Sequence, residues 1–308
     1  MTSVAAHTFF LPELYEQYLQ SLIAALTFLS NVFFWKTTNY FGSAAELKPL
    51  LHTWSLSLEE QYYLFAPLYV AAVYKWFNKN WYWALYPPLI TSFLLSCFLM
   101  DKAASANYFM LPTRGWEILL GAVLAAAPPF KVRSLLLANL LSISGIALIA
   151  YTAFYFDKST VFPGYSALLP CLGAAAIILA GSLIPARTYL VGKGLAFRPV
   201  VYVGLLSYSL YLVHWPVTVF FKYYRLAPLT LWDSLMVIGL SFLLALISYY
   251  LVERPFRKRE WSRKAIFSAS GAGIAGFVAF ALTMQLMQVP TSLERSHAAA
   301  NRQSDPCF

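Results

Sequence analysis

The chain has 308 residues, of which 60 % are hydrophobic, 18 % aromatic and only 11 % charged, and its formal net charge is +9. Soluble domains carry roughly 25 % charged residues, so this composition excludes an ordinary soluble protein and indicates one that lies in a lipid bilayer. The basic residues lie in short loops between apolar runs and not on one polar surface, which argues against a nucleic-acid partner.

The predicted elements are helices, because the apolar runs are long and do not alternate as barrel strands do. A helix needs about 20 mostly apolar residues to cross the hydrocarbon core. The sequence therefore predicts an all-α fold, a polytopic transmembrane helix bundle of about nine spans. In chain order the spans cover about 19–35, 57–75, 81–100, 108–127, 134–154, 164–184, 199–221, 232–252 and 265–288.

The loops give the predicted orientation. The loop 253–264 holds Arg254, Arg257, Lys258, Arg259, Arg263 and Lys264. Because cytoplasmic loops are enriched in Lys and Arg, we place this loop in the cytoplasm of a multi-pass protein of the inner (plasma) membrane. Alternation then leaves more basic residues inside than outside. It places the N-terminus in the cytoplasm and the stretch after 288 in the periplasmic or extracellular space.

Four segments follow from this reading. We expect a cytoplasmic leader at 1–18, a transmembrane core at 19–260, an additional transmembrane helix at 261–288 and an external polar tail at 289–308. The tail resembles the start of a linker. The three cysteines have no metal-binding spacing, so no metal site is expected.

The first polar cluster enters the second predicted span and reads His52-Thr53-Trp54-Ser55-Leu56-Ser57-Leu58-Glu59-Glu60-Gln61. Adjacent Glu59 and Glu60 point about 100° apart on a helix, so they cannot share one role. Ionisable groups in a span are costly and are therefore candidates for function. The structural alternative is that the two acids stabilise a helix N-terminus at the membrane surface.

The second cluster is Thr113-Arg114-Gly115-Trp116-Glu117. Arg114 and Glu117 are three residues apart and can pair on one helix face. An arginine here can hold a carboxylate, a phosphate or a developing oxyanion, and the alternative is a purely structural ion pair.

The third cluster runs from Ser207 to Pro216. Ser207, Tyr211 and His214 follow i, i+4, i+7 spacing and form one polar stripe, and Pro216 predicts a kink beside His214. The histidine can act as a base or proton relay, or it can be a packing residue. With the predicted orientation, all three clusters fall in the outer half of the bilayer, so we expect one polar cavity there.

In this order the clusters resemble the acyltransferase-3 family of membrane O-acyltransferases, which modify O-antigen, peptidoglycan and exopolysaccharides. The resemblance runs from about residue 20 to 260. The matching stretches are Tyr40-Phe41, residues 49–64, 113–121 and 204–216, and Glu253-Arg254-Pro255-Phe256-Arg257.

The resemblance implies an acyl donor, usually acetyl-CoA, reached from the cytoplasm, and a cell-envelope glycan hydroxyl as acceptor. Acyl-CoA is then a co-substrate, and no bound cofactor is expected. As supporting catalytic residues it suggests His52, Glu59, Glu60, Arg114 and Glu117. As substrate-binding residues it suggests Trp54, Ser55, Ser57, Gln61, Ser207, Tyr211 and His214.

The chain departs from the family pattern at both ends. Family members begin with two further spans, the first carrying an Arg and the principal catalytic His, and some end in an external SGNH-type esterase domain. His7 lies in the leader and is no counterpart of that His. We therefore expect a truncated chain with little or no transferase activity by itself.

Two other functions stay open at this point. Polar residues within kinked spans also suit a transporter or flippase of glycan intermediates, although no inverted repeat is evident. A non-catalytic membrane scaffold is the other alternative, and the expected absence of the first spans adds weight to it.

Overall fold

The computed structural model of this chain describes residues 2–38, 43–128, 133–157, 159–225, 228–258 and 261–287. Within these ranges every regular element is a helix, which confirms the predicted all-α fold class. The expected tail at 289–308 and the Tyr40-Phe41 pair lie outside the described residues.

The chain divides into two compact units, one formed by Met1–Ser57 with Leu206–Phe308 and the other by Leu58–Leu205. Two helices, α4 (Thr53–Phe77) and α11 (Arg198–Arg225), contribute residues to both units.

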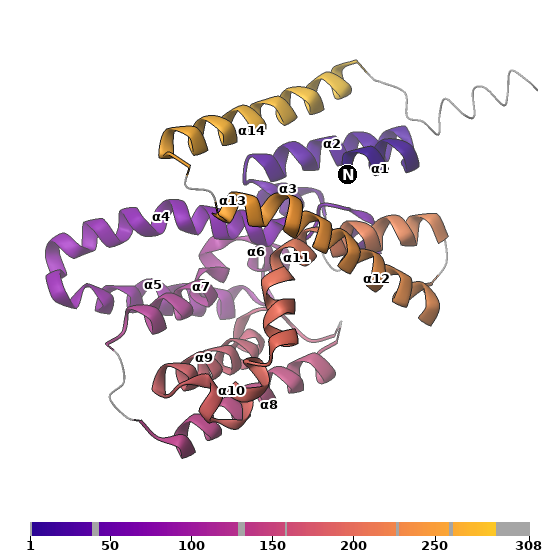
Figure 1. The fold of residues 1–308 in the computed structure, drawn as a ribbon. Helices are drawn as coiled ribbons and strands as arrows, with labels where there is room; N and C mark the ends of the chain where they lie inside the picture. The colour runs from indigo at the N-terminus through magenta and orange to yellow at the C-terminus, as the bar shows by residue number, and fades with distance from the viewer. Residues whose placement is uncertain are drawn as a thin grey trace, which may run out of the picture. The chain divides into compact units, whose positions relative to one another are not determined.

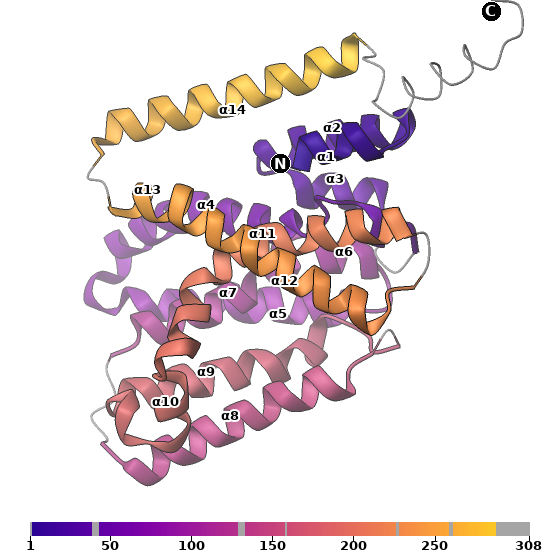
Figure 2. The same ribbon diagram turned by 45° about the vertical axis from the view of Figure 1, so that its right-hand side comes forward.

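The first unit combines helices from the two ends of the sequence. In both views α14 lies beside α2, and the two helices are in contact (Figures 1 and 2). Besides parts of α4 and α11, this unit contains α1 (Thr2–Phe9), α2 (Pro12–Leu26), α3 (Ser30–Thr37), η1 (Ser43–Leu47), α12 (Leu231–Ser248), the π-helix η5 (Tyr249–Glu253), α13 (Arg254–Lys258) and α14 (Arg263–Leu286).

The second unit is held together by close helix pairs. A Cβ added at Gly145 would lie only 2.6 Å from the Gly173 carbonyl oxygen. The helices α8 (Leu135–Tyr155) and α9 (Leu168–Leu183) therefore pack so closely that a larger side chain would clash at this contact. Besides parts of α4 and α11, the unit contains η2 (Asn78–Leu85), α5 (Tyr86–Leu99), α6 (Ala104–Phe109), α7 (Leu111–Ala126), α8 (Leu135–Tyr155), η3 (Gly164–Ala167), α9 (Leu168–Leu183), η4 (Ala186–Thr188) and α10 (Leu190–Leu195).

Seven helical segments in the described part of the chain are long and apolar enough to cross a membrane, which supports a multi-pass protein. They correspond to the third to ninth predicted spans. The segments are Asn80–Leu99, Ala104–Ala126, Leu135–Tyr155, Gly164–Leu183, Arg198–Arg225, Leu231–Arg257 and Arg263–Leu286.

The first two predicted spans are not among these seven. The span expected at 19–35 is wrong as one helix, because α2 ends at Leu26 and α3 begins only at Ser30. Between them Phe28 adopts a left-handed backbone conformation with φ of 57°, which reverses the chain. The second span coincides with the 25-residue helix α4, which carries charges at both ends of its apolar stretch.

This reversal also bears on the predicted orientation. Phe10 and Tyr18 line the same small cavity as Thr37 and Lys48. Because these residues meet around one cavity, we expect the two stretches to lie on one side of a membrane. This expectation differs from the predicted cytoplasmic leader at 1–18 with Lys48 outside, and that orientation stays a prediction.

Candidate functional site

His52 is the buried centre of a polar cluster in the first unit. It lies in the turn that precedes α4 and is only 8 % exposed. Just before it in the chain, the Lys48 carbonyl oxygen accepts a hydrogen bond of 2.9 Å from Trp215 Nε1. The indole therefore fixes the segment that carries His52 against α11.

A chain of hydroxyl groups connects this turn to α11. The Tyr211 hydroxyl donates to the His52 carbonyl oxygen. A phenol has one proton, so in its contact with the Ser55 hydroxyl Tyr211 is the acceptor and Ser55 the donor. The turn, the start of α4 and the middle of α11 are thus joined through Tyr211.

His214 lies one turn beyond Tyr211 on the same face of α11. The His52 and His214 ring centroids are 6.0 Å apart, and each ring also faces the Tyr211 ring, at 5.3 Å and 5.7 Å. Three of the residues singled out from the sequence therefore come together from two distant stretches of chain.

Hydrogen bonding fixes which nitrogen of His214 is basic. Nδ1 lies 2.8 Å from the Tyr211 carbonyl oxygen and 3.1 Å from that of Leu210. Carbonyl oxygens only accept, so Nδ1 carries the proton and Nε2 is the nitrogen with a lone pair in the neutral ring. Such an imidazole can accept a hydrogen bond or a proton from a bound hydroxyl group.

His52 is electrostatically different from His214. Burial, and to a smaller extent the charge that His214 can carry, lowers the pKa of His52 to about 4. Backbone carbonyls of Leu212 and Pro49 oppose this shift only in part. The ring is therefore neutral near pH 7 and cannot serve as the cation of the site.

The other residues of the first sequence cluster lie in varied surroundings. Ser57 is 1 % exposed, and its hydroxyl contacts the Ser30 hydroxyl at 2.7 Å and accepts from the Ser30 amide at 3.2 Å. It therefore joins α3 to α4 and is not open to a substrate in this structure. Trp54 is half-buried beside Ser55 at the start of α4.

The two acids of this cluster belong to the second unit. Glu59 and Glu60 are exposed on α4, and Gln61 beside them is half-buried. Among the described residues, neither glutamate forms an ion pair. Their predicted catalytic role stays a prediction. Ser207, the first residue of the predicted stripe, is exposed one turn before Tyr211.

Arg114 and Glu117 form the predicted pair in the second unit. Arg114 Nε lies 2.8 Å from Glu117 Oε1, and the two side chains are 13 % and 19 % exposed. The Arg114 guanidinium carbon also lies 5.3 Å from the ring centroids of both Tyr108 and Phe162. Two aromatic faces and a carboxylate therefore hold one largely buried cation.

Buried hydrogen bonds fix the helix that carries this pair. Thr113 donates to the carbonyl oxygens of Asn107 and Met110 at the start of α7, at 2.8 Å and 2.9 Å. The Ser92 hydroxyl of α5 accepts from the Trp116 amide at 3.0 Å. These bonds leave little freedom in the position of the Arg114 backbone.

A further polar group was missed as a site candidate. Glu253, in the π-helix η5, accepts a hydrogen bond of 2.8 Å from Ser209 and one of 3.1 Å from Arg257. Single-turn π segments often occur at functional positions. Glu253 opens the last motif of the family resemblance, and that motif was the available signal.

Comparison with known proteins decides what kind of protein has this arrangement. A family model described as an acyltransferase domain matches residues 18–254. The chain belongs to the acyltransferase-3 family. No solved structure matches this family member significantly.

Curated relatives are similar to this chain over most of its length. The O-acetyltransferase OatA of Staphylococcus aureus (strain NCTC 8325 / PS 47) is 30 % identical over 262 residues, which cover 81 % of this chain and 43 % of the relative. The peptidoglycan O-acetyltransferase OatA of Listeria monocytogenes is 27 % identical over 272 residues, which cover 81 % and 42 %. The acyltransferase-3 chain therefore spans less than half the length of these relatives.

Proposed function

We propose that the chain forms the membrane core of an O-acyltransferase that transfers an acyl group, acetyl from acetyl-CoA, to a hydroxyl of a cell-envelope carbohydrate. The family match and the names of the curated relatives support acyl transfer and an envelope acceptor. We place it in the inner (plasma) membrane.

The observation that carries the proposal is the cluster of His52, Tyr211 and His214 in the first unit. In this cluster, His214 is the histidine whose basic nitrogen is defined, because its Nδ1 donates to two backbone carbonyl oxygens. We assign His214 Nε2 to the acceptor side, where it accepts a hydrogen bond from the carbohydrate hydroxyl and orients it. Tyr211 and Ser55 hold the surrounding backbone in place.

The transfer itself has simple requirements. The acceptor hydroxyl loses its proton to a base, and its oxygen attacks the carbonyl carbon of the thioester. The carbon–sulfur bond then breaks, and coenzyme A leaves as a thiolate that takes up a proton. The developing oxyanion and the phosphates of the donor both need positive charge nearby.

We assign Arg114, in the second unit, to binding the phosphates of the donor. Its guanidinium is largely buried and already positioned by Glu117 and two aromatic rings, so little side-chain freedom remains to be lost on binding. The basic residues after α12 add a cytoplasmic surface that attracts anionic acyl-CoA.

The test of the acceptor role compares three replacements of His214, introduced into the gene of the cell that makes this protein. Labelled acetate transfer from acetyl-CoA to envelope carbohydrate is measured in membranes, with protein amounts matched by immunoblot. Gln places a polar atom near the Nε2 position, whereas Asn keeps a donor near Nδ1 only. We expect His214→Gln to retain most activity, and His214→Asn and His214→Ala each to lose about tenfold, the value of one hydrogen bond.

A matched pair of arginines provides the second arm. Arg114→Ala is expected to abolish transfer at unchanged expression, whereas Arg187→Ala, at an exposed position of η4, should leave it intact. Unchanged transfer by Arg114→Ala would remove this residue from the proposed donor-binding role. Equal losses for all three His214 variants would contradict a role limited to orienting the hydroxyl.

A further inference from the structure

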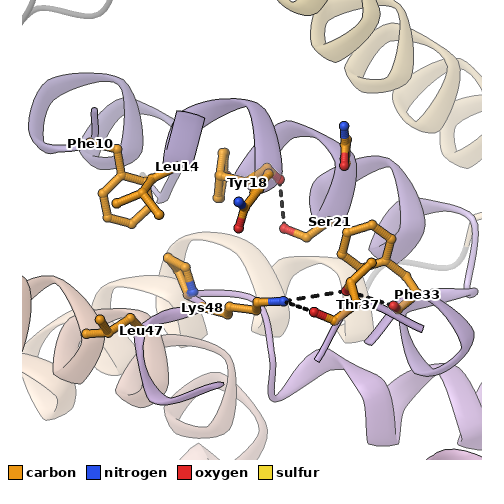
Figure 3. A pocket seen from close by; sticks show the side chains of 11 residues that line it. Phe10, Leu14, Tyr18, Ser21, Phe33, Thr37, Leu47 and Lys48 are labelled. Atoms are coloured by element: carbon orange, nitrogen blue, oxygen red, sulfur yellow. Dashed lines mark hydrogen bonds between the residues drawn. The ribbon is translucent and has the colours of Figure 1, made fainter. Parts of the chain in front are cut away.

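The cavity lined by Tyr18, Thr37 and Lys48 has a volume of about 250 Å³ and lies in the first unit, between α2 and the segments 33–37 and 47–49 (Figure 3). It is smaller than the ~300–1,000 Å³ pockets that hold drug-sized ligands, so it suits a single ring-sized group. Phe10, just before α2, forms one wall with Leu14, Tyr18 and Ser21 of α2, and Phe33, Thr37, Leu47 and Lys48 face it (Figure 3).

One side of the cavity offers both donors and acceptors. Gln17, Gln20 and Ser21 recur at spacings of three and four residues, so they share one face of α2. Each glutamine amide carries two donors and an acceptor, and Gln20 uses one donor in a 3.4 Å contact to Glu16. The rings of Phe10 and Phe33 supply apolar surface in the same cavity.

Lys48 adds a positive charge. Its ammonium donates to the Thr37 carbonyl oxygen at 2.9 Å and to the Thr38 hydroxyl. Burial lowers the pKa of Lys48, yet among the described residues no carboxylate lies within 4 Å of its nitrogen. A half-buried cation without a carboxylate neighbour is electrostatically suited to an anionic ligand.

The same segment connects this cavity to the histidine cluster. Lys48 and Pro49 line the cavity, and His52 follows three residues after Pro49. The Lys48 carbonyl oxygen accepts from Trp215, the neighbour of His214 in α11. A molecule seated in the cavity would therefore lie next to the turn that carries His52, within one compact unit.

We propose that this cavity is a binding subsite for an acidic sugar of the acceptor carbohydrate. Its carboxylate faces Lys48, its hydroxyl groups bond to Gln17 and Gln20, and the apolar face of its ring packs on Phe33. This assignment rests on the proposed function, since it specifies the substrate class of that same site. Aromatic, amide and cationic groups in one small cavity are the combination that a charged, hydroxyl-rich ring requires.

The test measures binding without any acyl donor, so it can fail while acyl transfer persists. The full chain is purified in detergent, and saturation-transfer NMR is recorded with methyl glucuronide, methyl glucoside and glycerol 3-phosphate. We expect the strongest effect with the glucuronide. Lys48→Gln should reduce glucuronide affinity at least fivefold and leave the weaker glucoside binding unchanged, whereas Lys36→Gln, at an exposed lysine of α3, should change neither.

A second set of variants covers the case in which Lys48→Gln disturbs folding. Lys48→Arg keeps the charge and should restore glucuronide binding, and Leu14→Trp should block both sugars by filling the cavity while Lys48 stays in place. Glucuronide binding that is equal in the native chain, Lys48→Gln and Leu14→Trp would overturn the subsite. Preference for glycerol 3-phosphate would overturn the sugar assignment and indicate a lipid headgroup, and absence of all binding would also refute the proposal.

Discussion

His52 and His214 lie in one cluster, yet their surroundings give them different chemistry. His52 is buried in a turn, where removal from water disfavours the imidazolium form. His214 donates from Nδ1 to backbone carbonyls and keeps Nε2 as its basic nitrogen. Because of this difference, we assign the hydrogen bond to a substrate to His214. We assign to His52 the role of a neutral residue that positions the cluster.

This difference predicts a pH dependence of stability. The pKa of His52 falls from its ordinary value of 6.5 to about 4 in the folded chain. Between these values only the unfolded chain binds the proton, so stability falls as pH drops from 6.5 to 4 and levels off below, by up to about 3 kcal/mol. Thermal unfolding of the purified chain at several pH values should show a shallower slope in this window for His52→Gln. Equal slopes would contradict the buried, neutral His52.

Part of this site could be predicted from residue spacing. The i, i+3 spacing of Tyr211 and His214 places them on one helix face, and the same spacing pairs Arg114 with Glu117. Spacing could not show that His52 would join them, because that contact depends on the turn before α4. Nor could it show that Ser57 is occupied by Ser30, a partner far away in the sequence.

At the scale of the helices, close approach depends on individual glycines. Gly145 and Gly173 face each other across α8 and α9, and a Cβ on either would lie under 3 Å from the opposing carbonyl oxygen. Backbone cannot yield as a flexible side chain can, so a methyl group here forces the helices apart.

We therefore expect Gly145→Ala to destabilise the chain by about 1–3 kcal/mol. Gly121→Ala in α7 is the matched control, because nothing lies within 4 Å of its added Cβ, and helix propensity should make it neutral or stabilising. Thermal unfolding of both variants in detergent measures the difference. A Gly145→Ala chain as stable as Gly121→Ala would show that α8 and α9 do not pack this closely.

Hydropathy correctly predicted helices at eight of the nine expected spans and failed at the first for a local reason. The apolar run 19–35 satisfies the composition of a span, but the left-handed backbone at Phe28 divides it into α2 and α3. A phenylalanine gives no signal for such a turn, for which glycine or asparagine is usual. Only the packing around the fold-back could reveal it.

At the scale of the molecule, this fold-back changes the expected membrane topology. The stretches 10–21, 33–37 and 47–49 contribute residues to one cavity, so we expect them to share one side of the bilayer. Topology rules count basic loops between assumed crossings, and one false crossing reverses the inferred side of everything before it.

Cysteine labelling tests this topology. In a chain whose own cysteines are replaced by serine, Glu16→Cys and Lys36→Cys should react with a membrane-impermeant maleimide from the same side. Arg257→Cys, in the basic stretch that we place in the cytoplasm, should react from the opposite side. Labelling of Glu16→Cys and Lys36→Cys from opposite sides would restore the single crossing at 19–35.

The proposed acyl transfer is tested most directly by the ester-linked acetate on the envelope carbohydrate of cells with and without this gene. The acetate is released by mild alkali and quantified per unit of carbohydrate. We predict that removing the gene eliminates a distinct class of these esters, that the native gene restores them, and that the gene with Arg114→Ala does not. Unchanged acetate together with reduced carbohydrate export would contradict acyl transfer and support transport of the glycan instead.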